Sequence, residues 1–262
     1  MQKIGFSTGS IALDDFRRGL DVANHWLTSA VELSALREQE LEPLLAARDE
    51  LGTDLQRFEY VSLHAPSKRV LLSEAALVRK LRPVAERGWP IIVHPDMIED
   101  ARLWRSLGDA VCIENLDRRK RCGRTAAELK RIFSELPDAT LCFDIGHARQ
   151  VDPTMQEAET ILRIYHRRLR QVHMSYVNSQ SRHERLNYGS ILAFRRVAHW
   201  LSDTVPIILE TPVDSSQVEE EIAAARSVFR HAGFAWGPDR ASMTHERAVE
   251  PLCVVERPGD SS

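Results

Sequence analysis

Residues 110–147 read AVCIENLDRRKRCGRTAAELKRIFSELPDATLCFDIGH, with two short apolar runs on either side of one amphipathic stretch. The runs AVCIE at 110–114 and TLCFD at 140–144 show no polar alternation, which is typical of strands covered on both faces in a parallel sheet. Between them, Thr125 and Glu128 have the spacing of a capping box before the helical pattern AAELKRIFSEL. The stretch therefore predicts a strand–helix–strand unit of a parallel α/β fold.

The same alternation extends over most of the chain. Further capping boxes are expected at Thr154 with Glu157 and at Ser216 with Glu219, and Gly233 is expected to end the last helix. Eight strands and their helices in about 230 residues favour a single closed (β/α)8 TIM barrel of the α/β class over an open doubly wound sheet. The eight strand-like runs are 3–7, 30–34, 60–64, 90–94, 110–114, 140–144, 171–175 and 206–210.

The chain has 262 residues, a length that α/β barrels often form as one domain. We expect residues 1–233 to form the barrel and residues 234–262 an irregular C-terminal tail, since the strand–helix pattern fades there. A net charge of −3 gives no general attraction to nucleic acid or an anionic membrane, and no apolar run is long enough to span a bilayer. The absence of a signal-peptide core and of CxxC spacing favours reduced thiols and a cytoplasmic location.

Imidazole and carboxylate side chains lie at the ends of six consecutive predicted strands, and two more histidines follow in the adjoining loops. The catalytic groups of a TIM barrel lie at the carboxyl ends of its strands, so these side chains are expected at one rim. A single histidine at a strand end is usually structural, but burying the whole set is costly unless a cation compensates it. Such ligands suit Zn, Mn or Co, and the residues concerned are His64, His94, Glu114, Asp144, His147, His173, His183 and Glu210.

Six short strings along the chain resemble the xylose isomerase-like barrel superfamily. That superfamily includes sugar isomerases, 3-epimerases and AP endonucleases of the endonuclease IV type. The resemblance covers about residues 1–230, and its more specific parts are the D-x-G-H motif at 144–147 and the pair Glu114–Asn115. The strings are SLHAP at 62–66, VHPD at 93–96, CIENLD at 112–117, CFDIGHA at 142–148, QVHMS at 171–175 and IILETP at 207–212.

In the isomerase and epimerase branch of that superfamily, one metal is held by a Glu, an Asp, a His and a second Glu. The resemblance places these four ligands at Glu114, Asp144, His173 and Glu210. It implies that the metal polarises the substrate carbonyl while the two glutamates exchange the proton of the neighbouring carbon. In this branch His147 would bind a substrate hydroxyl.

The endonuclease branch holds three zinc ions with nine groups, and eight of them have counterparts in this chain. His183, in the string SRHERLNYGSI, matches the eighth, whereas the ninth, an Asp, is Ser181 here. A hydroxyl is a poor replacement for a carboxylate ligand, so we expect the third metal position to be empty or weakly occupied and its imidazoles to bind substrate oxygens. His64 and His94 would complete a second site with Glu114 or contact substrate directly.

Basic residues gather in the loop after the fifth strand, which reads NLDRRKRCGR at 115–124. Basic runs are usually solvated, but on the catalytic rim they indicate an anionic substrate such as a sugar phosphate or a sugar acid. The loops contain few aromatic or apolar side chains that could hold open a damaged DNA duplex. Glu32, in the run AVELS, is expected either to face the barrel mouth or to form a structural salt bridge. The predicted substrate-binding residues are Glu32, His64, His94, His147, His183, Arg118 and Arg121.

These patterns together predict an enzyme that uses one or two divalent metal ions, manganese or zinc. The expected reaction is isomerisation or epimerisation of a small, anionic or sugar-like substrate, with Glu114 and Glu210 as the catalytic residues. One alternative is an endonuclease IV-like phosphodiester hydrolase, the only case with a nucleic-acid partner. Another is a metal-binding accessory protein without catalysis. No membrane partner is expected, and the sequence leaves the oligomeric state open.

Overall fold

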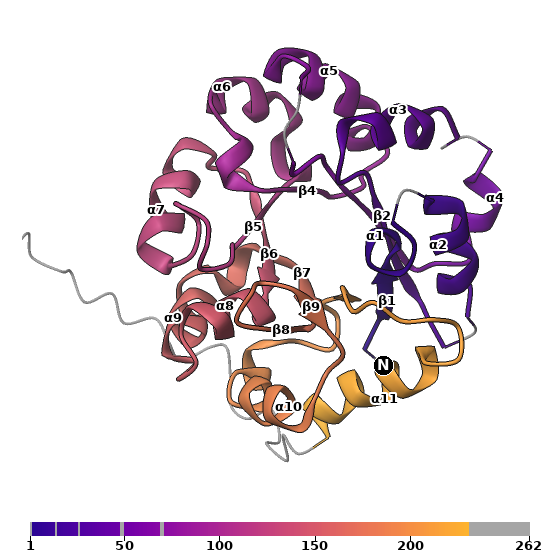
Figure 1. The fold of residues 1–262 in the computed structure, drawn as a ribbon. Coiled ribbons are helices and arrows are strands. Elements are labelled where there is room, and N and C mark those ends of the chain that lie inside the picture. The colour runs from indigo at the N-terminus through magenta and orange to yellow at the C-terminus, as the bar shows by residue number, and fades with distance from the viewer. Residues whose placement is uncertain (1, 14, 26, 48–49, 69–70, 231–262) are drawn as a thin grey trace, which may run out of the picture. The chain divides into compact units, whose positions relative to one another are not determined.

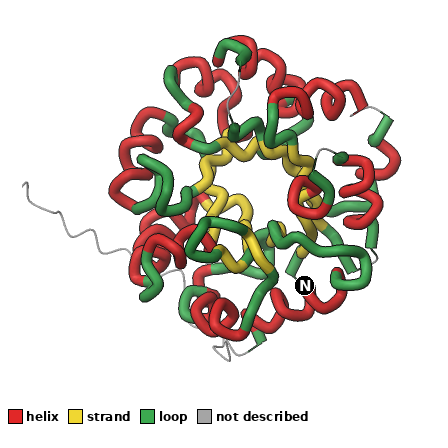
Figure 2. The backbone as a smooth tube through the Cα atoms, in the orientation of Figure 1, coloured by secondary structure: helices red, strands yellow, loops and turns green. Residues whose placement is uncertain are grey.

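Eight parallel strands close into a barrel, and helices surround it (Figures 1 and 2). The computed structural model describes residues 2–230 apart from residues 14, 26, 48–49 and 69–70. The strands pair in the order β1-β10-β7-β6-β5-β4-β3-β2, which confirms the predicted (β/α)8 barrel. They are β1 (Ile4–Ser7), β2 (Ala30–Ser34), β3 (Tyr60–His64), β4 (Ile91–Val93), β5 (Val111–Glu114), β6 (Thr140–Asp144), β7 (Leu169–Met174) and β10 (Ile207–Leu209).

Helical segments connect the strands on the outside of the barrel (Figure 2). One connection differs, because a two-stranded antiparallel hairpin of β8 (Tyr176–Val177) and β9 (His183–Glu184) follows β7 before the chain enters a helix. Four short 3₁₀ turns, η1 (Pro95–Met97), η2 (Arg105–Ala110), η3 (His166–Arg168) and η4 (Ala198–Trp200), adjoin the helices. The helices are α1 (Thr8–Ile11), α2 (Phe16–Ala23), α3 (Glu38–Ala47), α4 (Gly52–Leu55), α5 (Glu74–Ala85), α6 (Ala101–Trp104), α7 (Ala126–Glu135), α8 (Ile145–Val151), α9 (Gln156–Tyr165), α10 (Tyr188–Arg195) and α11 (Val218–Phe229).

The main apolar core includes side chains from both the strands and the helices, with Phe6 and Phe143 from strands and Trp104 and Phe194 from helices. A second, separate cluster contains Ile92, Cys112 and Cys142. Both cysteines are free thiols. The strands also bury polar side chains, among them Glu32, Ser62, Gln171 and His173.

The start of α7 agrees with the sequence pattern. The Thr125 hydroxyl accepts a hydrogen bond from the Glu128 backbone N–H at 3.2 Å. The reciprocal half of the capping box is missing, because the Glu128 carboxylate accepts from the backbone and guanidinium of Arg124 instead. Of the predicted capping box, only the hydrogen bond from the Glu128 backbone N–H to the Thr125 side chain is therefore formed.

The other two predicted capping boxes are wrong. α9 begins after Met155 and α11 after Gln217, each one residue later than the predicted capping residue. In both segments an upstream aspartate accepts the local hydrogen bonds instead. Asp152 accepts from the backbone N–H groups of residues 154 and 157, and Asp214 accepts from the N–H and hydroxyl of residue 216.

Contacts along the chain separate Met1–Ala232 from Gly233–Ser262. The predicted tail at 234–262, and the helix end expected at Gly233, lie outside the described residues. Among the helices of the described part, none has the length and apolar character that a bilayer span requires.

Gly5 on β1 pairs with Ala30 on β2. A Cβ atom at this position would lie 1.6 Å from the Ala30 carbonyl oxygen, so a side chain here would force the two strands apart. We expect Gly5→Ala to lower the free energy of unfolding by about 3 kcal/mol in urea titrations. Gly52→Ala is the matched control, because among the described residues no atom outside its own helix and chain neighbours lies within 4 Å of the added Cβ, and its effect should stay within about 1 kcal/mol. Equal effects of the two substitutions would contradict the steric argument.

Candidate metal centre

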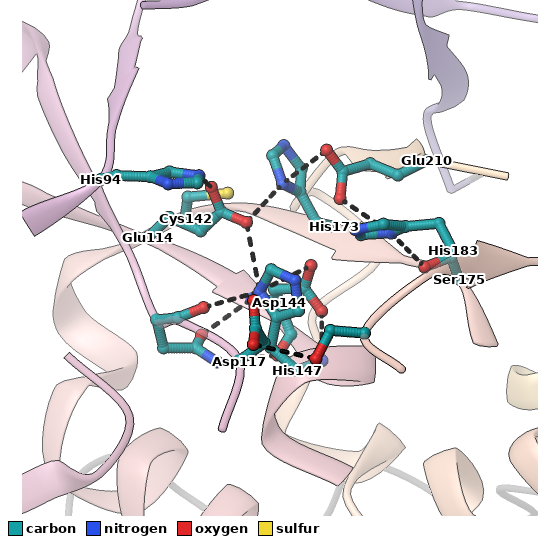
Figure 3. A network of polar contacts seen from close by, with 12 residues as sticks. His94, Glu114, Asp117, Cys142, Asp144, His147, His173, Ser175, His183 and Glu210 are labelled. Carbon is teal, nitrogen blue, oxygen red and sulfur yellow. Dashed lines mark hydrogen bonds and ion pairs between the residues drawn. The ribbon is translucent and has the colours of Figure 1, made fainter. Parts of the chain in front are cut away.

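The carboxyl ends of the strands bring together the side chains that the sequence singles out. His64, Glu114 and Asp144 are the last residues of β3, β5 and β6, and His173 belongs to β7. Glu210 directly follows β10. Because the parallel strands close into a barrel, these ends meet at one rim, and Figure 3 shows most of these side chains pointing toward one another.

The central group contains three carboxylates and one imidazole. Its members are Glu114, Asp144, His173 and Glu210, and one ligand atom from each lies within 4.8 Å of the others. His173 Nδ1 is 3.2 Å from Glu114 Oε1 and 3.5 Å from Glu210 Oε1. Three of the four side chains are at most 1% exposed, while Glu210 is 14% exposed. The structure thus brings together all four residues that the resemblance assigned to one metal.

A second group shares Glu114 with the first. His64 Nε2 and His94 Nε2 lie 3.3 and 2.9 Å from Glu114 Oε2, whereas Glu114 Oε1 faces His173. The two carboxylate oxygens of Glu114 therefore face different groups of imidazoles (Figure 3). This arrangement would allow Glu114 to bridge two cations.

A third group shares Asp144 with the first, and its other members are His147 and His183. His147 Nδ1 lies 3.2 Å from Asp144 Oδ2, and the rings of His147 and His183 are 5.3 Å apart. The sequence pattern offers the hydroxyl of Ser181 beside these two imidazoles, whereas the third group in the structure includes the carboxylate of Asp144.

The D-x-G-H motif owes its geometry to the start of α8. Asp144 Oδ1 accepts a hydrogen bond of 2.6 Å from the His147 backbone N–H, which caps the helix and leaves Asp144 Oδ2 for the site. A Cβ at Gly146 would lie 2.5 Å from the Ser175 carbonyl oxygen, so only glycine lets α8 pack this closely. Asn115 holds the other side of Asp144, with its amide donating to the Asp144 carbonyl and accepting from the Asp144 N–H, both at 2.8 Å.

Burial and neighbouring charges perturb the acids of the central group in opposite directions. Burial raises the pKa of Asp144, and the nearby Glu114 carboxylate adds to this effect. Burial likewise raises the pKa of Glu210, which Glu114 and Asp144 raise further. For Glu114, burial acts in the same sense, but His94 and His173 outweigh it and the pKa falls well below its usual value. Concentrated negative charge of this kind favours a cation.

A family model of xylose isomerase-like TIM barrels matches residues 98–232, just over half of the chain. The chain belongs to this family. The matched segment contains β5, β6, β7 and β10, and therefore all four residues of the central group. No match was found among curated protein sequences.

Solved structures with the same fold include other xylose isomerase-like barrels. A candidate sugar phosphate isomerase/epimerase from Anabaena variabilis gives a TM-score of 0.56 at 13% identity, covering 92% of this chain and 91% of that one. A candidate 3-DHS dehydratase of petrobactin synthesis from Bacillus anthracis gives 0.56 at 11%, covering 87% and 97%. A xylose isomerase-like TIM barrel protein from Mycobacterium smegmatis in complex with magnesium gives 0.53 at 13%, covering 87% and 97%. At these identities the likeness concerns the fold alone.

The side chains of this xylose isomerase-like barrel fit a divalent cation. Asp144 Oδ2 is buried and accepts no hydrogen bond among the described residues, even though His147 Nδ1 is nearby. The ring N–H of His147 has another acceptor, the Asn115 carbonyl oxygen at 3.0 Å. Carboxylate oxygens and imidazole nitrogens are ligands for Zn, Mn or Mg, and a cation would satisfy the free oxygen.

Glu32 lies inside the barrel and not at its mouth. Its side chain is fully buried, and its Oε2 is 2.8 Å from His173 Nε2. Of the two alternatives for Glu32, the structure shows the ion pair, here with His173, and not a side chain at the mouth, because β2 directs it beneath the central group. Glu32 therefore contacts His173, which is one of the predicted metal ligands.

Arg118 and Arg121 do not join the donor groups. The Arg118 guanidinium donates to the Ser179 carbonyl, and the neighbouring Arg119 pairs with Asp117 and donates to the carbonyls of residues 180 and 181. Arg121 is exposed and lines a groove between η1 and α7. Two further cations of this loop have acidic partners, since Lys120 pairs with Asp96 and Arg124 with Glu128. These acidic partners neutralise part of the positive charge of the loop, which the sequence analysis assigned to binding of an anionic substrate.

Several residues that complete the site were not predicted from the sequence. Asp117 Oδ1 accepts from the Ser181 hydroxyl at 2.9 Å, so a carboxylate from a different loop lies beside the serine. Ser175 bonds to His183 Nδ1 at 2.8 Å, and Gln171 bonds to Glu32. Residues 171 and 173 lie on β7 and Ser175 directly follows it at the same spacing, and this period of two is the signal that could have revealed Gln171 and Ser175.

Proposed function

We propose that this protein is a divalent-metal-dependent isomerase or epimerase of a small sugar or sugar derivative. The observation that carries the proposal is the central group, in which two buried carboxylates, one partly buried carboxylate and one buried imidazole meet at adjacent strand ends. Glu114 and Glu210 stand at its two ends, because β6 and β7 lie between β5 and β10 in the barrel. Two carboxylates placed in this way suit proton transfer on either side of a bound substrate.

The four residues of the central group would hold the cation. A bound divalent cation would polarise the substrate carbonyl and make the neighbouring C–H more acidic. One glutamate would then take the proton from that carbon, and the same or the other glutamate would return a proton to the adjacent carbon or to the opposite face. His147 and His183, from the third group, are placed to bind substrate hydroxyls.

The experiment uses protein loaded with Mn²⁺ in deuterated water and a panel of ketoses and sugar phosphates. We expect deuterium to enter a carbon next to the carbonyl, detected by NMR and mass spectrometry. Glu210→Gln should abolish this incorporation. Absence of incorporation across the panel, with cation bound, would contradict the isomerase proposal and favour the accessory protein if no other turnover is found.

The second candidate is metal-dependent phosphodiester hydrolysis, including cleavage of abasic DNA. The observation that favours it is the sharing of Glu114 and Asp144 among three donor groups, since adjacent cations stabilise both the attacking and the leaving oxygen. Incubation with abasic duplex DNA and with bis(p-nitrophenyl) phosphate tests it in parallel. Cleavage of either without deuterium incorporation would make hydrolysis the better assignment.

A further inference from the structure

A chain of buried polar side chains lies beneath the central group, inside the barrel. The Tyr60 hydroxyl is 2.6 Å from Gln171 Oε1, and Gln171 Nε2 is 2.8 Å from Glu32 Oε2. Glu32 Oε2 is in turn 2.8 Å from His173 Nε2. Glu32, Gln171 and His173 are fully buried. The chain therefore connects the lower part of the barrel to a residue of the proposed metal centre.

The direction of each hydrogen bond follows from the chemistry of Glu32. A carboxylate only accepts, so the nitrogen of the Gln171 amide must face it and Gln171 Oε1 must accept from Tyr60. Gln171 Nε2 is also 2.8 Å from His173 Nε2, but an amide nitrogen cannot accept a hydrogen bond. When His173 Nε2 carries a hydrogen, that hydrogen is therefore directed to Glu32 Oε2.

The pairing of Nε2 with Glu32 favours one nitrogen of His173 for a metal. With a hydrogen on Nε2, the lone pair of the neutral ring is on Nδ1, which faces Glu114 and Glu210. A carboxylate that accepts from the distal nitrogen of a ligating imidazole fixes the ring and makes it a better donor. We propose that Glu32 is a positioning residue of the metal centre, which holds His173 with Nδ1 directed at the cation.

The surroundings of Glu32 argue against a purely stabilising role. Its second oxygen, Oε1, is buried and has no hydrogen-bond partner among the described residues. An unsatisfied buried oxygen costs stability, and the hydrogen bonds to Gln171 and His173 use only Oε2 of this carboxylate. The Ser62 hydroxyl, 3.5 Å from Glu32 Oε2, is a weak additional contact.

The inference rests on the proposed metal centre, and the test measures cation affinity directly. Zn²⁺ is titrated into wild type, Glu32→Gln and Glu32→Ala in competition with a chromophoric chelator. We expect Glu32→Ala to bind about 10- to 100-fold more weakly. Glu32→Gln keeps the shape of the side chain and a hydrogen-bond acceptor but loses the charge. Its affinity for Zn²⁺ should therefore lie between those of wild type and Glu32→Ala.

Two further variants serve as controls within the same interior. Ser62→Ala removes only the weak contact and should bind Zn²⁺ as wild type does. Tyr60→Phe removes the far end of the chain but leaves Glu32 and His173 paired, so its loss should be smaller than that of Glu32→Ala. Metal-free Glu32→Gln should remain folded at the temperature of the titration, as its thermal unfolding checks, so that a lower Zn²⁺ affinity reports positioning and not loss of the fold.

The protonated nitrogen of His173 gives a readout that a merely structural role would not change. In ¹⁵N-detected NMR of the Zn²⁺-loaded wild type, the proton should be on Nε2, and Glu32→Ala should change the shift and exchange of that proton. Equal Zn²⁺ affinity of wild type and Glu32→Ala would overturn the positioning role alone. A wild type that binds no cation would overturn both this role and the metal centre, whereas normal binding without turnover would overturn only the proposed activity.

Discussion

Glu114→Gln is expected to abolish stable cation binding and to lower turnover by at least about 10³-fold. The reason is that Glu114 is common to two donor groups, with one oxygen facing His173 and the other facing His64 and His94. The amide keeps the shape of the side chain but removes the charge that several imidazoles surround. Metal content by mass spectrometry after gel filtration, together with kcat on the responding substrate, measures both effects.

Glu184→Gln is the matched control for this substitution. Glu184 is exposed on β9 near the same rim and bonds to the side chain of Asn178. Its replacement should leave metal content and kcat at the wild-type values. If Glu114→Gln keeps a full complement of cation, Glu114 is not a ligand and the central group must be reassigned.

The metal-free protein is expected to lose stability as the pH rises from about 5 to 8. Without a cation, burial and neighbouring carboxylates raise the pKa of Asp144 and of Glu210 to about 8, far above their ordinary values. At these two carboxyl groups the folded state then binds more protons than the unfolded state between pH 5 and 8, so each contributes stability below its unfolded pKa and loses that contribution as the pH approaches 8. His64 acts in the same direction, because Glu114 and Glu32 outweigh burial and raise its pKa to about 9. His183 opposes this trend up to about pH 6.5, because burial lowers its pKa to about 3.

Thermal unfolding in EDTA and with excess Mn²⁺ or Zn²⁺ tests this dependence. The melting temperature in EDTA should fall across this range, and a cation should raise it most at the alkaline end, where the carboxylates are deprotonated and ready to bind. Glu210→Gln removes one of the titrating groups, so its metal-free protein should depend less on pH. A metal-free melting temperature that stays constant or increases between pH 5 and 8 would contradict the argument.

The rim residues were predictable because a polar side chain that ends a buried apolar run is visible in the sequence. Parallel strands then bring such ends together without further information, as His64, Glu114 and Asp144 show. The partner of Glu32 was not predictable in the same way. β2 and β7 are not neighbours in the barrel, and their contact across the interior follows only from closure and register.

Two other predictions failed because several neighbouring residues could play the same role, and the sequence does not show which of them does. Thr154 and Ser216 had the spacing of helix caps, but aspartates two residues upstream are stronger acceptors. In the loop after β5, sequence alone could not distinguish arginines that bind substrate from those that bind the protein's own backbone. Arg118 and Arg119 are of the second kind.

The hydrogen bonds of Arg118 and Arg119 have a consequence for motion. They attach the loop after β5 to the carbonyls of residues 179, 180 and 181, between β8 and β9. The hydroxyl of Ser181 adds a bond to Asp117 in the same loop. Local opening of the hairpin that carries His183 must therefore break charge-assisted bonds to two guanidinium groups at once. Amide hydrogens of the two segments should then exchange with solvent as one cooperative unit.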